Sequence, residues 1–114
     1  MQIEAEKIPQ GSYCIRVWHD SKQYYGDYDV VATLLPRGDG LAEVGFTMGN
    51  LTNDVNIAIG LKAYELGFKK LRICVSHGHK VSRWAIFSHS DDKFDYYNVD
   101  LVAAVDYYTH NGSK

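Results

Sequence analysis

Imidazole and carboxylate side chains gather in one stretch in the second half of the chain. Both groups are ligands that Zn²⁺ and similar divalent ions accept. If residues 71–88 form a hairpin, the first two histidines lie at its tip and the third lies near its far end. The sequence therefore favours a solvated turn here and predicts no metal site. In chain order the set comprises His77, His79, His89, Asp91 and Asp92.

Candidates for acid–base or nucleophilic chemistry are few. Glu43 falls on a predicted strand, where its carboxylate could activate an amine or a water molecule, although a glutamate on the polar face of a sheet is the alternative. Cys14 and Cys74 each stand in an apolar stretch and are expected to be buried as small hydrophobic residues. No serine-nucleophile or phosphate-binding motif occurs. The sequence predicts no catalytic residue, and Glu43 is the candidate if the protein is an enzyme.

Tyrosines and opposite charges point instead to binding. Nine tyrosines occur, several in pairs beside aspartates, and tyrosine is enriched at protein interfaces. Residues 62–83 carry a net charge of +5 and residues 91–108 a net charge of −4. These stretches are predicted to be docking surfaces for a protein partner; the alternatives are two solvated faces of one fold, or pairing between copies in a homodimer. The predicted partner-binding residues are Tyr96, Tyr97, Asp100, Tyr107, Tyr108, Lys69, Lys70 and Arg72.

Length and composition place these residues in one globular domain spanning 1–114. The 114 residues are 46% hydrophobic and 23% charged, which excludes a disordered or collagen-like chain. The net charge of −2 argues against a dedicated nucleic-acid binder. No apolar run is long enough to span a membrane, and the start of the chain lacks the apolar core of a signal peptide, so we expect a cytoplasmic protein.

Hydrophobic periodicity predicts an α+β fold with a mixed, mostly antiparallel sheet of four to six strands. A helix over 53–66 is expected to pack across one face, capped by Thr52 or Asn53 and ended by Gly67. Because a strand precedes and follows this helix, residues 41–75 form a predicted β-α-β unit. The predicted strands are 12–19, 28–35, 41–48 and 71–75, the second and third joined as a hairpin.

Two later segments have alternative interpretations. Residues 80–88 are either a strand, with 76–79 as its hairpin turn, or a short helix. Residues 98–109 are predicted to form a C-terminal helix capped by Asn98, whereas 94–101 could instead form one more strand.

Part of this pattern resembles the GNAT (Gcn5-related N-acyltransferase) family. Residues 41–46, LAEVGF, resemble the fourth strand of that family, and residues 60–75, GLKAYELGFKKLRICV, resemble its third helix and fifth strand. With the preceding hairpin and the following segment, the resemblance covers about 28–101. It implies a scaffold that binds acetyl-CoA and transfers the acetyl group to an amine.

The loop that binds the coenzyme in the family departs from its pattern here. The family has Arg/Gln-x-x-Gly-x-Gly/Ala between the fourth strand and third helix, whereas residues 49–56 read GNLTNDVN and place Asp54 near the phosphates. If acyl-CoA binds, the resemblance implies contacts from Gly49, Asn50, Thr52 and Asn53. We therefore predict a non-catalytic interaction or inhibitor-type protein, comparable to phage-encoded accessory proteins, that needs no cofactor. The alternative is a compact N-acyltransferase that uses acetyl-CoA, with Glu43 as its base.

Overall fold

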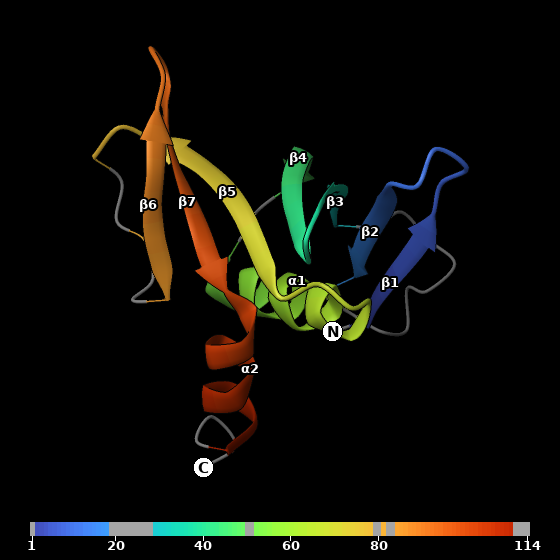
Figure 1. Cartoon of the computed structure of the whole chain (residues 1–114). Helices are drawn as coiled ribbons and strands as arrows, with labels where there is room; N and C mark the ends of the chain where they lie inside the picture. The colour runs from blue at the N-terminus through green and yellow to red at the C-terminus, as the bar shows by residue number, and fades with distance from the viewer. Residues whose placement is uncertain (1, 19–28, 50–51, 79–80, 82–83, 111–114) are drawn as a thin grey trace.

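The computed structural model describes residues 2–18, 29–49, 52–78, 81 and 84–110. They form an α+β domain, as predicted, with one mixed sheet and two helices (Figure 1). The strands are β1 (Gln2–Lys7), β2 (Tyr13–Trp18), β3 (Val30–Gly38), β4 (Leu41–Gly49), β5 (Lys70–Ser76), β6 (Ala85–Ser90) and β7 (Phe94–Asp100), and the helices are α1 (Asn53–Glu65) and α2 (Leu101–His110).

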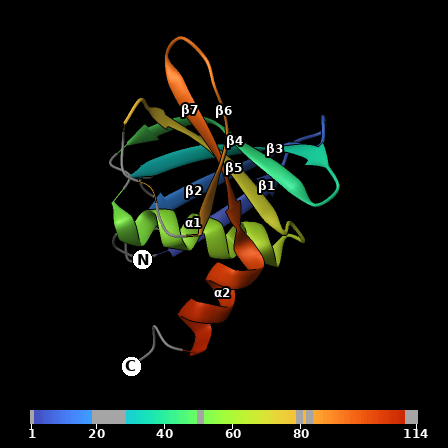
Figure 2. The ribbon, with the colours of Figure 1, turned by 60° about the vertical axis from the view of Figure 1, so that its left-hand side comes forward.

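The seven strands follow the order β1-β2-β3-β4-β5-β7-β6. Every neighbouring pair is antiparallel except β4 and β5, which are parallel and joined by α1. This confirms the predicted β-α-β unit and hairpin. Figure 2 shows α1 lying across the sheet and α2 projecting beyond the end of β7. Among the described residues, neither helix has the length and apolar character needed to cross a bilayer.

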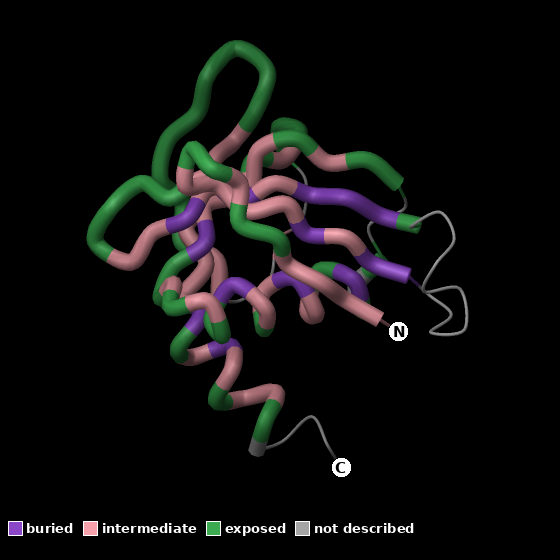
Figure 3. The backbone as a smooth tube through the Cα atoms, turned by 90° about the vertical axis from the view of Figure 1, so that its right-hand side faces the viewer, coloured by how far each residue is buried: buried purple, intermediate pink, exposed green. Residues whose placement is uncertain are grey.

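The core lies between α1 and the sheet. Strand side chains alternate between the two faces, and the inward residues of β2 and β3 are almost fully buried, as is Ala42 of β4 (Figure 3). Val55, Ile59 and Ala63 recur at helical spacing on α1 and cover this set. The strand and α2 members of the core are Ile15, Val17, Val30, Ala32, Leu34, Ala42, Leu71 and Leu101.

Both ends of α1 are fixed by its own sequence. The Thr52 side chain accepts a hydrogen bond from the main-chain N–H of Val55 at 3.3 Å, so Thr52 is the N-cap. Gly67 has a φ of 103°, which lets the chain reverse after the last turn. The N–H of Phe68 then donates to the carbonyl of Ala63 at 3.1 Å, forming the Schellman motif that the sequence predicts.

Two parts of the sheet differ from the sequence prediction. β1 was not expected, because the charges of its segment obscure the alternation of Ile3 and Ala5, which pack against the core. The predicted hairpin turn at 76–79 is wrong, because β7 lies between β5 and β6. Of the two alternatives for 80–88, the strand is the one found, as β6, and it forms its hairpin with β7 instead of β5. With β1 and β7 included, the sheet has seven strands, more than the four to six predicted.

The C-terminal segment contains both of the predicted alternatives in succession. Residues 94–100 form β7, and α2 follows immediately. Asn98 lies within β7 and does not cap the helix, contrary to the prediction. Asp100 does, because its Oδ1 accepts a hydrogen bond from the main-chain N–H of Ala103 at 3.1 Å.

Gly60 provides a test of how α1 packs. A Cβ at this position would meet only the Leu101 Cδ2 atom, at an ordinary van der Waals distance of 3.6 Å. Because alanine favours a helix over glycine, we expect Gly60→Ala to raise the free energy of unfolding by about 0.5–1 kcal/mol. Urea denaturation measures this change, and a destabilised variant would mean that α1 and α2 approach more closely than described.

Candidate functional site

The parallel strands β4 and β5 form a fork. Their Cα pairing covers only Leu41–Lys70, Ala42–Leu71 and Glu43–Arg72, although β4 continues to Gly49 and β5 to Ser76. Beyond the last pair the two strands diverge (Figure 1). Their facing edges then carry main-chain N–H and C=O groups that do not pair with each other.

A bulge bends β4 just past the start of this divergence. Val44 pairs with Leu34, but Ala32 pairs with Thr47, so Gly45 and Phe46 together face Thr33. The Thr33 hydroxyl oxygen accepts a hydrogen bond from the Phe46 N–H at 2.8 Å. A Cβ on Gly45 would lie 2.7 Å from that oxygen, so any side chain here would displace the Thr33 hydroxyl.

A cavity of about 560 Å³ occupies the fork. α1 lies along one side, and Tyr108 of α2 contributes to the lining. Most of the lining side chains are aliphatic or aromatic, and a few polar groups interrupt them, as in typical small-molecule sites. Residues on the two strands and α1 that line it include Val44, Thr47, Ile73, Cys74, Asn56 and Gly60.

Two of the residues that the resemblance assigns to coenzyme binding, Gly49 and Thr52, have roles in the fold. Gly49 has a φ of 100°, and a Cβ there would overlap the main-chain oxygen of Asp29. The Thr52 hydroxyl caps α1. Asn53 is the first residue of α1, and Asn50 lies outside the described residues.

The first turn of α1 also carries the exposed carboxylate of Asp54. A helix N-terminus attracts anions, but a carboxylate there opposes a second negative charge. Together with the commitments of Gly49 and Thr52, this charge makes the start of α1 a poor site for a diphosphate.

Glu43 lies at the last paired position of the fork. Because Ala42 points into the core beside it, the Glu43 side chain projects from the opposite sheet face. Its Oε1 accepts a hydrogen bond from the Nε atom of Arg37 at 3.0 Å, in an ion pair on the surface. This arrangement gives Glu43 a partner other than a substrate.

The predicted partner-binding tyrosines do not form one surface. Tyr96 and Tyr97 are neighbours in β7 and project from opposite faces of the sheet. The Tyr97 ring meets the Phe87 ring edge to face, with centroids 5.6 Å apart. Tyr107 and Tyr108 lie on α2, where their rings are 5.1 Å apart.

The charged stretches lie beside each other within one chain. β5 from the basic stretch pairs with β7 from the acidic stretch, and Lys70 is opposite Asp100. Lys69 and Lys70 are exposed, whereas the Arg72 Nε donates to the Asn98 Oδ1 atom at 3.2 Å. The protein partner therefore stays a prediction.

The two cysteines differ from the predicted burial. Cys14 is half-buried and Cys74 is exposed. Each alternates with core residues along its strand, and no described helix covers the sheet face opposite α1. The apolar residues beside each cysteine predict the strands correctly. They do not show which sheet face is left uncovered, and so they do not predict the exposure of the cysteines.

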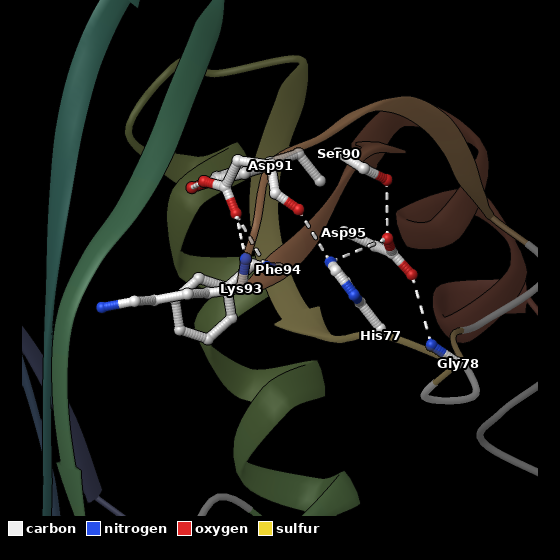
Figure 4. Close-up of polar contacts among 8 residues, drawn as sticks. His77, Gly78, Ser90, Asp91, Lys93, Phe94 and Asp95 are labelled. Atoms are coloured by element: carbon white, nitrogen blue, oxygen red, sulfur yellow. Dashed lines mark hydrogen bonds and ion pairs between the residues drawn. The ribbon is translucent and has the colours of Figure 1, made fainter.

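Asp91 closes the turn between β6 and β7 (Figure 4). Its Oδ1 accepts hydrogen bonds from the main-chain N–H groups of Lys93 at 2.9 Å and Phe94 at 2.8 Å. Its Oδ2 accepts one from the Tyr96 hydroxyl at 2.7 Å. These bonds, led by the Lys93 N–H, lower the pKa of Asp91 from 3.8 to about 2.

Asp95 and His77 tie this turn to the end of β5. The Asp95 carboxylate accepts hydrogen bonds from the Ser90 hydroxyl at 2.6 Å and the Gly78 N–H at 3.3 Å. The Ser90 bond is the main cause that lowers the pKa of Asp95. The His77 Nε2 atom lies 2.9 Å from the Asp91 carbonyl oxygen and 3.8 Å from an Asp95 carboxylate oxygen.

Of the remaining members of the metal-ligand set, His89 and Asp92 lie in the described part of the chain, and both are exposed. The His89 ring stacks on the Tyr96 ring, with centroids 4.4 Å apart. His79 lies outside the described residues. Within the part of the chain that the structure describes, no group of three or more histidine, cysteine, aspartate or glutamate side chains could hold a metal ion.

The Asp91 turn makes a pH-dependent contribution to stability. Because folding lowers the pKa of Asp91, the contribution is present above pH 3.8 and is lost as the pH falls towards about 2. We expect Asp91→Asn to have a lower urea midpoint than the wild type at pH 7, and the difference to vanish near pH 2. Asp92→Asn, at the exposed neighbouring position, is the control. Equal midpoints for both variants at pH 7 would contradict this role.

Comparison with known proteins identifies the fold. No family model matches the chain, and no curated protein does. The structure is similar to that of a "putative N-acetyltransferase" from Lactobacillus plantarum, with a TM-score of 0.54, 12% identity, and coverage of 83% of this chain and 73% of that one. It also resembles a cAMP-binding acyltransferase from Mycobacterium smegmatis, with a TM-score of 0.50, 15% identity, and coverage of 79% of this chain and 30% of that one. The chain has a GNAT-like fold, as the sequence resemblance predicts.

Proposed function

We propose that this protein binds the acylated pantetheine arm of a coenzyme A-type thioester in the β4–β5 fork, without a diphosphate site and without transferase chemistry. The observation that carries the proposal is the fork itself. Three Cα pairs hold the strands together, and a cavity of about 560 Å³ opens where they separate. This volume is in the range of small-molecule sites.

The ligand class follows from the chemistry of the fork. The diverging strands present main-chain donors and acceptors on two facing edges, which an extended chain with amide groups can satisfy as an added strand would. Pantetheine is such a chain, because its two amides are separated by short aliphatic segments. The aliphatic lining from Val44 and Ile73 suits those segments and a short acyl group.

The rest of coenzyme A fits less well. The diphosphate would meet Asp54 at the start of α1, while Gly49 packs against Asp29 and Thr52 caps the helix. These contacts support binding through the pantetheine arm alone. When bound, the ligand would supply a thioester carbonyl, which is the electrophile of acyl transfer.

The non-catalytic part of the proposal rests on Glu43. Its carboxylate is ion-paired with Arg37, with 3.0 Å between Oε1 and Nε, so it already has a partner other than an amine substrate. The alternative, an N-acyltransferase that acts on an amine, requires Glu43 to leave Arg37. Acetylation of an amine that is lost in Glu43→Gln would establish that alternative.

Amide chemical shifts test the location of the ligand directly. Titration of the ¹⁵N-labelled protein with S-acetylpantetheine should shift the amides of 44–47 and 73–75, on both sides of the fork, and leave those of β1 unchanged. Pantothenate, which lacks the thioester end, is the ligand control. Shifts confined to other strands, or no shift at millimolar ligand, would overturn the proposal.

A further inference from the structure

The outer edge of β6 is an open strand edge. β6 is the last strand in the sheet, and within the described residues no strand pairs with its outer side. Its sequence, AIFSHS, contains no lysine, arginine, acid or proline. Such an edge presents unpaired main-chain groups and is a template for another strand.

The opposite edge of the sheet is protected. β1 has the sequence QIEAEK, and its Glu6 and Lys7 are exposed. Charges along an edge oppose the approach of a second strand. The contrast between the two edges distinguishes β6 from an ordinary sheet terminus.

Exposed apolar side chains flank the open edge on both faces. Ile86 is 67% exposed and Phe87 is 56% exposed. As successive strand residues they project from opposite faces. A strand added beside β6 would therefore cover apolar surface above and below the sheet, and would extend the cross-strand aromatic pair of Phe87 and Tyr97.

The pairing of β6 with β7 determines which main-chain N–H and C=O groups of β6 can bond to an added strand. The Trp84 carbonyl accepts a hydrogen bond from the Asp100 N–H at 3.1 Å, so residue 84 directs its main-chain groups towards β7. Because strands alternate, Ile86 does the same, while Ala85 and Phe87 direct their N–H and C=O groups outwards. The bulge after Phe87 ends this regular stretch.

We propose that two copies of this chain associate through their β6 strands, antiparallel about a twofold axis at Ile86. In that register Ala85 of each copy exchanges both main-chain hydrogen bonds with Phe87 of the other, and the two Ile86 side chains meet at a close non-hydrogen-bonded position. The strand is self-complementary because it has no lysine, arginine, aspartate or glutamate to meet the same residue of its copy. A pairing this short forms a small interface, so the association is weak and depends on concentration.

Sedimentation equilibrium tests the proposal. The average mass of the wild type should rise from 12.9 kDa towards twice that value as the concentration increases to several hundred micromolar. Ile86→Lys places a charge on the axis and should remain at the monomer mass. Val102→Lys, which alters a 47% exposed residue on α2, should associate as the wild type does. A wild type that stays monomeric, or an Ile86→Lys variant that associates normally, would refute the interface.

Cross-linking then tests the register, in a protein whose native cysteines are replaced by serine. Facing Cα atoms in a non-hydrogen-bonded pair lie within reach of a disulfide, so Ile86→Cys should form a covalent dimer under mild oxidation. Glu6→Cys on the protected edge should not. The non-covalent association of the wild type should persist in 0.5 M salt; dissociation there would favour pairing of the charged stretches and overturn the β6 interface.

Discussion

Replacing Gly49 by alanine should lower the free energy of unfolding by about 2–4 kcal/mol, because a left-handed backbone and a steric overlap act together there. The φ of 100° is unfavourable for any residue with a Cβ. The new methyl group would also overlap the main-chain oxygen of Asp29. That oxygen belongs to the backbone, so it cannot move aside as a flexible side chain would. Urea denaturation at neutral pH measures the loss.

Gly11→Ala separates the two causes. Gly11 has a φ of 98°, but no atom lies within 4 Å of the position that its Cβ would occupy. Its replacement should cost only the conformational part, about 1 kcal/mol. If Gly49→Ala lowers the free energy of unfolding no more than Gly11→Ala does, Gly49 does not pack against Asp29. Our conclusion that Gly49 serves the fold and not a ligand would then be wrong.

Filling the fork from α1 should abolish ligand binding. Gly60 lines the cavity, and its missing side chain leaves room beside Leu101. A phenyl ring there would occupy space that the acyl and pantetheine groups need. We expect Gly60→Phe to weaken binding of S-acetylpantetheine at least tenfold, measured by calorimetry, while its circular dichroism spectrum stays that of the wild type.

Gly60→Ala is the matched control for this substitution. It adds only a methyl group at an ordinary contact distance, so it should retain binding within about twofold while stabilising the helix. Equal affinity of the wild type and Gly60→Phe would show that the ligand does not enter the cavity.

Local features of the fold could be predicted because neighbouring residues determine them. Thr52 and Gly67 identify the ends of α1, since capping depends on side-chain and backbone groups within a few residues. The hairpin around Pro36 and the strand after α1 follow from turn residues and apolar runs in the same way. These elements belong to the GNAT-like fold that the structural comparison confirms.

The pairing of β7 between β5 and β6 could not be predicted in this way. No residue within or beside β6 indicates whether this strand pairs with β5 or with β7. The pairing depends on contacts between the strands, such as that of Tyr97 with Phe87. The divergence of β4 and β5 cannot be predicted from the sequence for the same reason. Gly45 is one residue in a strand sequence, and its role becomes visible only when Thr33 lies against it.

The affinities of acetyl-CoA and S-acetylpantetheine, measured side by side by calorimetry, test the central claim most directly. If the fork supplies the binding energy, a diphosphate at the start of α1 adds none, because Asp54 carries a negative charge there. We therefore expect the two ligands to bind with affinities within about threefold of each other. Acetyl-CoA binding more than tenfold tighter, or neither ligand binding at millimolar concentration, would contradict it.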